Sequence, residues 1–492
     1  MINELPALGV GLTYCDGLHT FVLEHQDLID IVEVEPQTLW FADRYADDAY
    51  HLDENTASQI DALPMPKLVH GVGFPVGGSR PPRRGQLGPL NCLLSRWHAP
   101  WMSEHLSFNR ANLSGCEFNT GFLLPPLQTE EGIEAAVRSI RSFASEVGVP
   151  LAVETGVSYF APLPGEMPDG EFVAEVTRRA NCGILLDLHN LYANEHNGRQ
   201  PITSFLDQIP LERVWEVHVA GGQEHRGYWL DAHSGAMSND LFCLAREIIG
   251  SLPNVRAIIF ELFSSYVHQV GGGVVLAELE RLHEIWEAHG REQPRRLAAA
   301  ARDPRAALAI GLSPEPREWE DTLGALVAGQ DAHGPLADHL QQDPGLAITR
   351  ELVGDFRASM LASTVKLTIR LLLLTLGETS LSDLLNRFWR LSPPQLFAST
   401  EAEVFGQFVR RQQLEIPYLD DVLSFELATV AALIDKKPQI VPFEHDPVVV
   451  LRALGEGRLP DSPSEGRFEI ELSVGDLPES ARIPLSAHPV LH

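Results

Sequence analysis

Histidine and carboxylate side chains recur in this sequence where short apolar runs stop. His70 ends the run Lys-Leu-Val-His, Glu154 ends Leu-Ala-Val-Glu, and Asp187 ends Ile-Leu-Leu-Asp. Three further runs carry the same residue types, at His105, His218 and Glu261. Any one of them alone is more often a hydrogen-bonded core residue. Three carboxylates and three imidazoles buried together lose hydration, and their like charges repel, unless cations compensate them, so the set predicts a metal site.

Two loops add three candidate ligands. Asn190 follows Asp187 by three residues in Asp-Leu-His-Asn, and Asp231 and His233 stand two apart in Leu-Asp-Ala-His-Ser-Gly. Residues two apart in an extended chain share a face, so Asp231 and His233 are expected to reach one ion together. In the competing interpretation Asn190 caps a helix, and the other two residues form a surface turn.

The ligand types and their number indicate which metals the site would hold. Histidine and carboxylate without thiolate suit iron, manganese or zinc rather than a cysteine-rich structural zinc site. Nine candidates exceed what one ion uses, so two or three metals are expected. A mixed set with positions open for oxygen or substrate is typical of non-haem iron chemistry.

Eight apolar runs are predicted to be the strands that position these residues. Most are rich in Val, Ile or Leu, as parallel strands covered on both faces are. Helical periodicity separates them, clearest over Glu130–Val147, Gly170–Ala180 and Asn239–Ser251. Such alternation predicts a (β/α)₈ TIM-type barrel with its active site at the carboxyl ends of the strands, although an open doubly wound sheet gives a similar pattern. The runs are Leu8–Leu12, Ile29–Glu35, Lys67–Val72, Met102–Phe108, Pro150–Glu154, Gly183–Asp187, Val214–Val219 and Arg256–Glu261.

A second, smaller domain is predicted after the barrel. Residues 1–290 are assigned to the barrel, 291–316 to an Ala- and Pro-rich linker, and 317–492 to a mainly helical α+β domain. Its last part, with Val448–Leu454 and the alternating Phe468–Val474, suggests a small α+β or winged unit. The apolar run Leu367–Leu376 contains Arg370 and is far shorter than the ~20 residues of a membrane span, so a buried helix is expected.

Composition narrows the classes of partner and the compartment. The net charge of −30 disfavours a nucleic-acid or anionic-membrane surface, because both need clustered Lys and Arg. The amino terminus lacks a basic region followed by an apolar stretch, so no secretory signal is expected. Five scattered cysteines suggest no disulfide framework and fit the cytoplasm. They are interpreted as structural, with Cys15 alone near the predicted barrel mouth.

Taken in chain order, the motifs resemble those of the DUF692 family, the multinuclear non-haem iron-dependent oxidative enzymes (MNIO) that include the methanobactin biosynthesis oxidase. The similarity covers roughly Leu8 to Gly290, and its combined motifs are specific although each alone is weak. The motifs are Val-His70-Gly-Val, Ser-Glu-His105-Leu-Ser, Val-Glu154-Thr-Gly, Leu-Leu-Asp187-Leu-His-Asn190, Val-His218-Val-Ala-Gly, Leu-Asp231-Ala-His233-Ser-Gly and Ile-Phe-Glu261-Leu.

The resemblance implies an iron enzyme that acts on a peptide. It implies two or three irons of mixed Fe(II)/Fe(III) state, dioxygen as co-substrate, and oxidation of a cysteine or another residue in a ribosomally made precursor peptide with a leader. The nine candidates above occupy the family's ligand positions. Family enzymes commonly work with a separate protein that grips the leader, and residues 317–492 resemble a fused version of it in position and size.

Three positions depart from the family pattern. The second strand is followed by Glu33-Val-Glu-Pro-Gln37 in place of the usual Glu-Val-His-Ala-Glu-Asn. His189 replaces the first of two paired asparagines, and Gly222 replaces the second histidine of His-Leu-Ala-Gly-His. The nine ligand positions are unaffected, but the substrate pocket is expected to differ.

Two other classes of function fit the same residues. A divalent-metal sugar isomerase or endonuclease-like barrel also places His, Glu and Asp at strand ends, and it would need no oxygen. A non-catalytic metal-binding scaffold would hold its ions in closed coordination spheres, whereas open positions favour catalysis.

Overall fold

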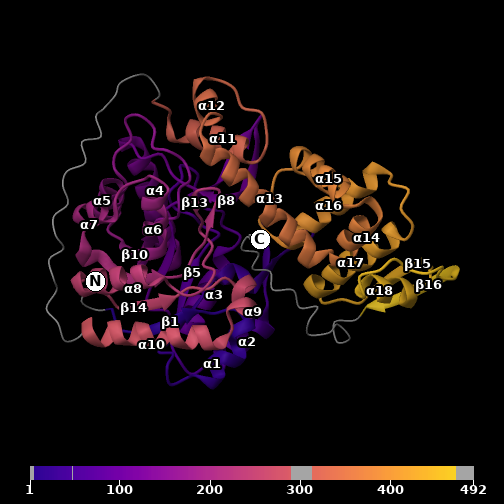
Figure 1. Ribbon diagram of the computed structural model, residues 1–492, viewed down its shortest axis with the longest axis horizontal. Coiled ribbons are helices and arrows are strands. Elements are labelled where there is room, and N and C mark those ends of the chain that lie inside the picture. Colours follow the sequence, from indigo (N-terminus) through magenta and orange to yellow (C-terminus); the bar gives the residue numbers. More distant parts are fainter. Residues whose placement is uncertain (1–4, 47, 290–312, 473–492) are drawn as a thin grey trace.

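The computed structural model describes residues 5–46, 48–289 and 313–472 (Figure 1). Eight parallel strands form a closed barrel in the order β1-β14-β11-β10-β9-β6-β5-β2, and β1 pairs with both β14 and β2. Closure confirms the predicted (β/α)₈ barrel and rules out the open sheet. The strands are β1 (Gly9–Thr13), β2 (Ile31–Val34), β5 (Lys67–Gly71), β6 (Met102–His105), β9 (Leu151–Glu154), β10 (Gly183–Asp187), β11 (Val214–Val219) and β14 (Ala257–Phe260).

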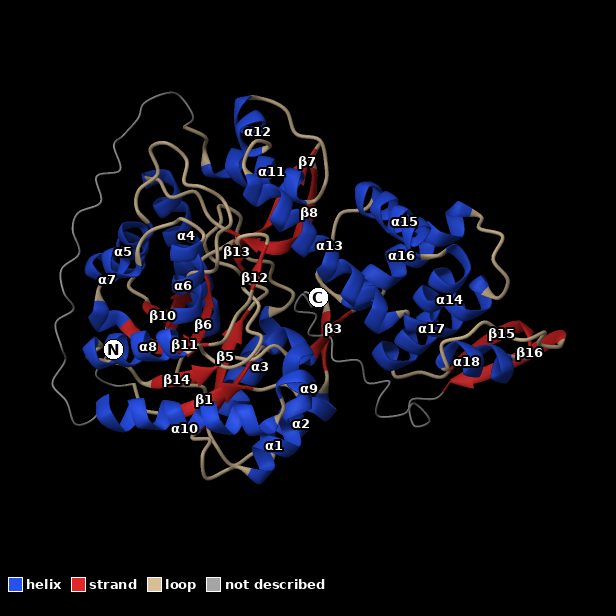
Figure 2. Cartoon of the chain, in the orientation of Figure 1, coloured by secondary structure: helices blue, strands red, loops and turns tan. Residues whose placement is uncertain are grey.

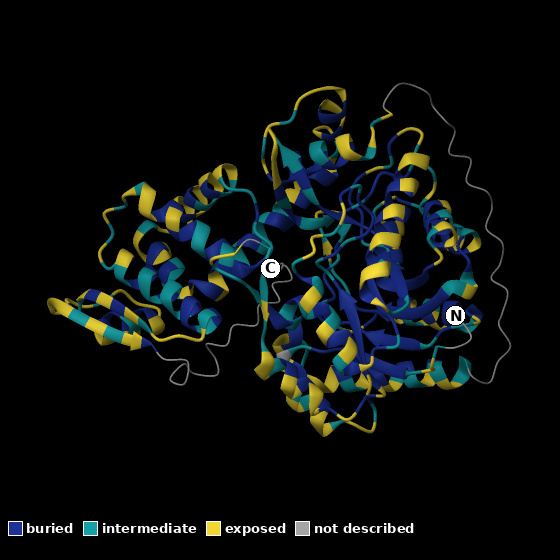
Figure 3. Cartoon of the chain, turned by 180° about the vertical axis from the view of Figure 1, so that it is seen from behind, coloured by how far each residue is buried: buried dark blue, intermediate teal, exposed yellow. Residues whose placement is uncertain are grey.

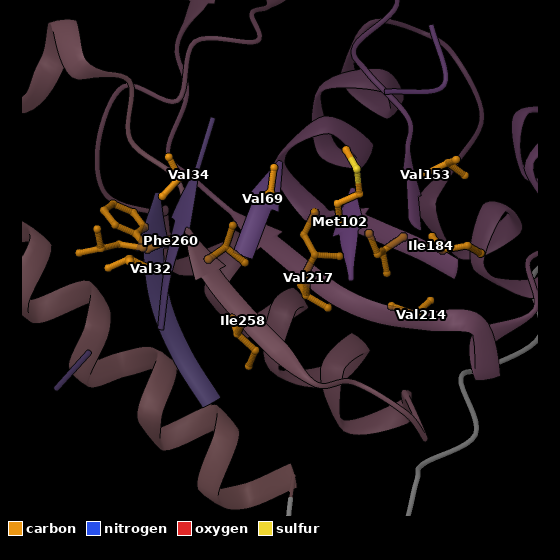
Figure 4. Packing of buried hydrophobic residues seen from close by; sticks show 14 of the residues in the cluster. Val32, Val34, Val69, Met102, Val153, Ile184, Val214, Val217, Ile258 and Phe260 are labelled. Carbon is orange, nitrogen blue, oxygen red and sulfur yellow. The ribbon is translucent and has the colours of Figure 1, made fainter. Parts of the chain in front are cut away.

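Alternation along the strands gives the barrel two separate apolar layers. Residues such as Val32, Val69 and Ile258 belong to the large core between strands and helices, shown in Figure 4. Their neighbours form a second buried cluster, comprising Ile31, Leu68, Trp101, Ala152, Leu185, Trp215, Ala257 and Ile259. Because successive side chains of a strand point to opposite faces, this second cluster fills the interior of the barrel.

Helices surround the barrel as the periodicity predicts (Figure 2). The predicted helices Glu130–Val147 and Asn239–Ser251 have the observed bounds, and the third begins one residue earlier, at Asp169. The helices are α1 (His19–Glu24), α2 (Glu54–Asp61), α3 (Leu87–Trp97), α4 (Glu130–Val147), α5 (Asp169–Ala180), α6 (Leu188–His196), α7 (Ile202–Gln208), α8 (Asn239–Ser251), α9 (Val267–Val270) and α10 (Gly272–His289). Exposed residues lie on their outer faces (Figure 3).

Three short hairpins leave the barrel at its loops. They are β3 (Trp40–Ala42) with β4 (Tyr50–Leu52), β7 (Phe108–Leu113) with β8 (Cys116–Leu124), and β12 (Glu224–His225) with β13 (Tyr228–Trp229). Helix α11 packs against the β7–β8 hairpin. Its Trp319 and Leu323 are buried in one cluster with Phe108 and Leu124 of the hairpin. The start of the predicted second domain therefore packs on the barrel.

The C-terminal region is mainly helical, as predicted. Its elements are α11 (Pro316–Val327), α12 (Pro335–Leu340), α13 (Pro344–Thr364), α14 (Lys366–Leu376), α15 (Glu378–Leu391), α16 (Ala398–Gln412), α17 (Leu419–Asp435), β15 (Gln439–His445), α18 (Pro447–Gly455) and β16 (Glu465–Leu472). Helix α13 runs from the barrel into a separate core formed by α14 to α18 (Figure 1). Strands β15 and β16 pair antiparallel with α18 between them in sequence, which forms the expected small α+β unit.

The run Leu367–Leu376 is a helix, but it is only partly buried: Leu371 and Leu372 lie in the core, while Leu373 is 43% exposed. Residues 291–312, most of the predicted linker 291–316, lie outside the described residues. Within the described part of the chain, no single helix meets the length and hydropathy of a membrane span, although the bent pair α13–α14, at 109°, meets them jointly.

Candidate metal centre

The candidate ligands form a polar layer one step above the apolar interior of the barrel. Residues two apart on a strand face the same side, so the positions two residues after Ile31, Leu68, Ala152, Leu185 and Ile259 also point inward. These positions are Glu33, His70, Glu154, Asp187 and Glu261, and every one of them is buried. The carboxyl ends of parallel strands meet at one end of a barrel, which brings the five side chains together.

The first group consists of His70, His105 and Glu154. Both Nε2 atoms lie 3.3 Å from Oε2 of Glu154. The other ring nitrogens have separate partners, since Nδ1 of His70 is 2.9 Å from Oγ of Ser103 and Nδ1 of His105 is 3.0 Å from the carbonyl oxygen of Gly71. A carbonyl only accepts, so Nδ1 of His105 is the donor and its Nε2 is available as a ligand.

The second group consists of Asp187, Asp231 and His233. Nε2 of His233 lies 3.2 Å from Oδ1 of Asp231 and 3.6 Å from Oδ2 of Asp187, and its Nδ1 lies 3.1 Å from Oε1 of Glu261. His233 has a φ of 37°, a backbone conformation that residues other than glycine rarely adopt. Its ring is therefore held in place at some cost in backbone strain. His233 is buried, and the surface-turn interpretation fails for it.

His218 connects a third group to the other two. Its Nδ1 lies 2.9 Å from Oε2 of Glu261, while its Nε2 lies 3.0 Å from Oε1 of Glu33 and 3.9 Å from Oε1 of Glu216. The sequence argument did not assign Glu33 or Glu216 to the site. Their signal was present, because Glu216 shares a strand face with His218 and Glu33 stands inside an apolar run.

Asn190 lies beside these groups without capping its helix. Asp187 is the N-cap of α6, and its Oδ1 accepts the backbone N–H of Asn190 at 2.8 Å. The Asn190 side chain instead donates from Nδ2 to Oε1 of Glu154 at 3.0 Å. All nine predicted residues therefore gather at one end of the barrel, and His189 joins them, its ring centroid 4.8 Å from that of His233.

The buried ligand-type side chains shift one another's pKa values. Burial raises the pKa of Glu154 and of Asp187, and the neighbouring carboxylates add to the effect. Burial opposes protonation of His105 and His233, but nearby carboxylates outweigh it and raise the pKa of each imidazole to about 10. Adjacent carboxylates that resist ionisation and imidazoles that hold protons are what a metal-free ligand cluster shows.

The arrangement of the donor atoms fits metal ions. Oε2 of Glu154 and Oδ2 of Asp187 are buried and accept no well-formed hydrogen bond from the described residues. Ligand atoms within 4.8 Å of one another occur in four sets: His70, His105 and Glu154; Asp187, His189 and His233; Glu33, Glu216 and His218; and Glu154, Asp187 and His218. Nitrogen and carboxylate donors of this kind suit iron, manganese or zinc.

Two cavities share part of their wall, and the inner one reaches the ligands. The inner cavity, of about 170 Å³, is lined by His70, His105, Glu154 and His233 and also by Phe356 from α13. The outer cavity, of about 450 Å³, lies against the β3–β4 and β7–β8 hairpins. Both cavities are lined by Asn109, Asn119 and the segment Gln395–Phe397, so the C-terminal region forms part of the wall of the site.

The five cysteines differ in burial. Cys182 is buried, whereas Cys92, Cys116 and Cys243 are exposed, so packing in a core supports the structural interpretation for Cys182 and not for these three. Cys15 is half-buried and packs against the barrel core.

The closed barrel, with histidine and carboxylate groups at the carboxyl ends of its strands, defines a (β/α)₈ protein with a candidate polynuclear metal centre. Residues 9–285, more than half of the chain, match the family described as "RiPP precursor modification enzyme MbnB/TglH/ChrH". The chain belongs to this family, whose description names the precursors of ribosomally synthesised and post-translationally modified peptides (RiPPs) as what its members modify. The resemblance noted in the sequence is thereby confirmed.

Individual relatives are described only as UPF0276 proteins. One from Anaeromyxobacter is 31% identical over 256 residues, which span 51% of this chain and 80% of that protein. One from Chromobacterium violaceum is 33% identical over 184 residues, 37% of this chain and 65% of that protein. Among solved structures, a xylose isomerase domain protein from Planctomyces limnophilus is 16% identical with a TM-score of 0.37, over 58% of this chain and 99% of that one.

Proposed function

We propose that this chain is a dioxygen-dependent, multinuclear non-haem iron enzyme that oxidises a cysteine of a ribosomally made precursor peptide. The observation that carries the proposal is the pair of ligand groups that meet at Glu154, Asp187 and His218. The first group offers two imidazoles and one carboxylate, a ligand set typical of iron sites that leave positions open for dioxygen and substrate.

The protein residues would divide the work as follows. His70, His105 and Glu154 would hold one ion and Asp187, Asp231 and His233 a second, while His218 and Glu261 would complete the set of ligands. Asn190 supports the set through its contact with Glu154. Two or three irons of mixed Fe(II)/Fe(III) state would supply the activation of dioxygen and accept electrons from the substrate.

The surroundings of the cluster favour a controlled oxidation. Phe263 and Phe397 line the inner cavity beside the ligands and make part of its wall apolar. No cysteine is among the residues that line either cavity, so a thiol that enters the site would come from the substrate.

We further propose that the C-terminal region performs the task of a separate leader-binding protein. Its segment Gln395–Phe397 and Phe356 border the inner cavity, which supports a direct role beside the site. A precursor peptide would then contact the barrel and the C-terminal region of one chain.

Anaerobic purification with metal analysis and Mössbauer spectroscopy tests the metal. Two or three irons in each chain are expected, whereas one zinc and no iron would favour the isomerase or endonuclease-like alternative.

Co-expression with a short cysteine-containing peptide encoded beside the gene tests the reaction. An oxygen-dependent mass change in the peptide is expected; an iron-loaded protein with closed coordination and no such change would favour a scaffold.

A further inference from the structure

His189 meets Trp229 where the chain has no side chain at position 222. The indole Nε1 of Trp229 lies 3.1 Å from Nε2 of His189. A Cβ atom on Gly222 would lie 2.3 Å from Nε2 of His189 and 2.4 Å from Nε1 of Trp229. Since any side chain would occupy the place of this contact, glycine is required here for space.

The contact fixes the tautomer of the imidazole. An indole N–H is a donor only, so Nε2 of His189 must accept from it. A neutral imidazole with an accepting Nε2 carries its proton on Nδ1. That proton faces Oδ1 of Asn190, 3.4 Å from Nδ1.

The hydrogen bonds continue from Asn190 to Glu154 of the first ligand group. The Asn190 oxygen faces His189, so its amide nitrogen is turned to Glu154, where it donates to Oε1 at 3.0 Å, and toward the carbonyl of Thr155 at 3.4 Å. With Oε1 engaged, Oε2 of Glu154 is left facing the Nε2 atoms of His70 and His105.

We propose that His189 is a positioning residue that orients Asn190 and, through it, Glu154, and that it does not bind metal. The inference rests on the proposed function only in that the cluster holds metal ions. The alternative is that His189 is itself a metal ligand. Distance alone would allow this, because Asp187, His189 and His233 offer ligand atoms within 4.8 Å of one another. As a ligand through Nδ1, however, His189 would have to release either its Nδ1 proton or the Trp229 contact.

Nitrogen NMR of protein labelled with ¹⁵N-histidine tests the tautomer without iron, dioxygen or peptide. The His189 signals are assigned by their loss in His189→Gln. We expect the Nδ1–H tautomer in the metal-free protein and the same tautomer after loading with Zn²⁺. An Nε2–H tautomer, or a Zn²⁺-induced shift typical of a coordinated nitrogen, would overturn the proposal. Because Zn²⁺ is the probe, failure of the iron chemistry leaves this result readable.

Paired substitutions test the positioning role through metal affinity. A carboxamide can accept from Trp229 and donate to Asn190, so His189→Gln should keep the full metal stoichiometry and affinity. His189→Leu removes both functions and should weaken binding at the first ligand group about 10-fold or more. Loss of one metal equivalent in both variants would show a ligand and overturn the proposal, as would unchanged affinity in His189→Leu.

The glycine offers a matched comparison. Gly222→Ala should displace the His189–Trp229 contact and reproduce the loss in His189→Leu. Gly273→Ala, on α10 with no heavy atom within 4 Å of the added Cβ, is the control and should bind metal normally. Equal metal affinity of the two alanine variants would contradict the positioning role.

Discussion

Oε1 of Glu33 lies 3.0 Å from Nε2 of His218, on the opposite side of the ring from Glu261. Glu33 and His218 are both fully buried in the barrel. A carboxylate behind an imidazole fixes the orientation of the ring and makes the other nitrogen a stronger ligand. Glu33 was not among the predicted ligands, but this contact gives it the role of orienting His218.

Glu33→Gln should therefore weaken metal binding at His218 by about 10- to 100-fold while the barrel still folds. The measurement is a competition titration with a chromophoric chelator, accompanied by circular dichroism. Glu24→Gln, at an exposed position on α1, is the control. Unaltered metal affinity in Glu33→Gln would mean that Glu33 only fills the barrel interior.

Glu154 should be indispensable for metal content. Its Oε2 faces two imidazoles, so Glu154→Gln replaces the shared carboxylate by a neutral and weaker ligand. We expect the loss of at least one metal equivalent, measured by elemental analysis of protein purified anaerobically. The exposed Glu146→Gln serves as control, and full occupancy in the Glu154 variant would remove this residue from the ligand set.

Metal uptake should strengthen as the pH rises. The pKa values of His105 and His233 are raised to about 10 in the metal-free site, so below that pH each imidazole must lose a proton before it binds. In the metal-free protein the same shifts stabilise the fold fully below pH 6.5, and this contribution is lost as the pH rises through 10. Affinity titrations between pH 6 and 8 should show proton release on binding; a pH-independent affinity would contradict it.

Chelation should destabilise the barrel. Glu154, Asp187 and Glu261 come from three different strand ends, and a bound cation compensates their mutual repulsion. A metal at 100 times its dissociation constant adds about 2.7 kcal/mol to the free energy of unfolding. Calorimetry before and after chelation should show a lower Tm in the metal-free protein, with recovery when iron(II) is restored under anaerobic conditions.

Trp319 should bind the C-terminal region to the barrel. Its side chain is 3% exposed, packs with Phe108 and Leu124, and donates from Nε1 to the carbonyl of Pro125 at 2.9 Å. Trp319→Ala should lower the free energy of unfolding by about 3–5 kcal/mol. Denaturant titration measures the loss, with Trp286→Ala on the half-buried face of α10 as the comparison, where a smaller loss is expected.

The barrel was predictable from sequence because its signals are local. Strands covered on both sides are apolar throughout, and a ligand-type residue such as His70 or Glu154 is conspicuous at the end of such a run. The helices α4 and α8 could also be predicted, because their apolar residues recur with helical spacing. The match to a family of peptide-modifying enzymes over residues 9–285 then confirmed the family resemblance.

The contacts of Glu33 and Glu216 with His218 and the wall of the cavity could not be predicted from the sequence. Glu33 and Glu216 look like isolated polar residues in their own strands, and only barrel closure places both beside His218. Gln395 and Phe397 are distant in sequence from every ligand, and the packing of α13 and α16 decides that they border the site.

By itself, the sequence determined which residues stand at the carboxyl ends of the strands, because strand periodicity is a property of neighbouring residues. The tertiary structure decided which atoms face one another: it set Oε2 of Glu154 between two imidazoles and turned His189 toward Trp229 over a bare glycine. Those choices depend on barrel shear, loop conformation and side-chain orientation, which arise only when distant segments pack together.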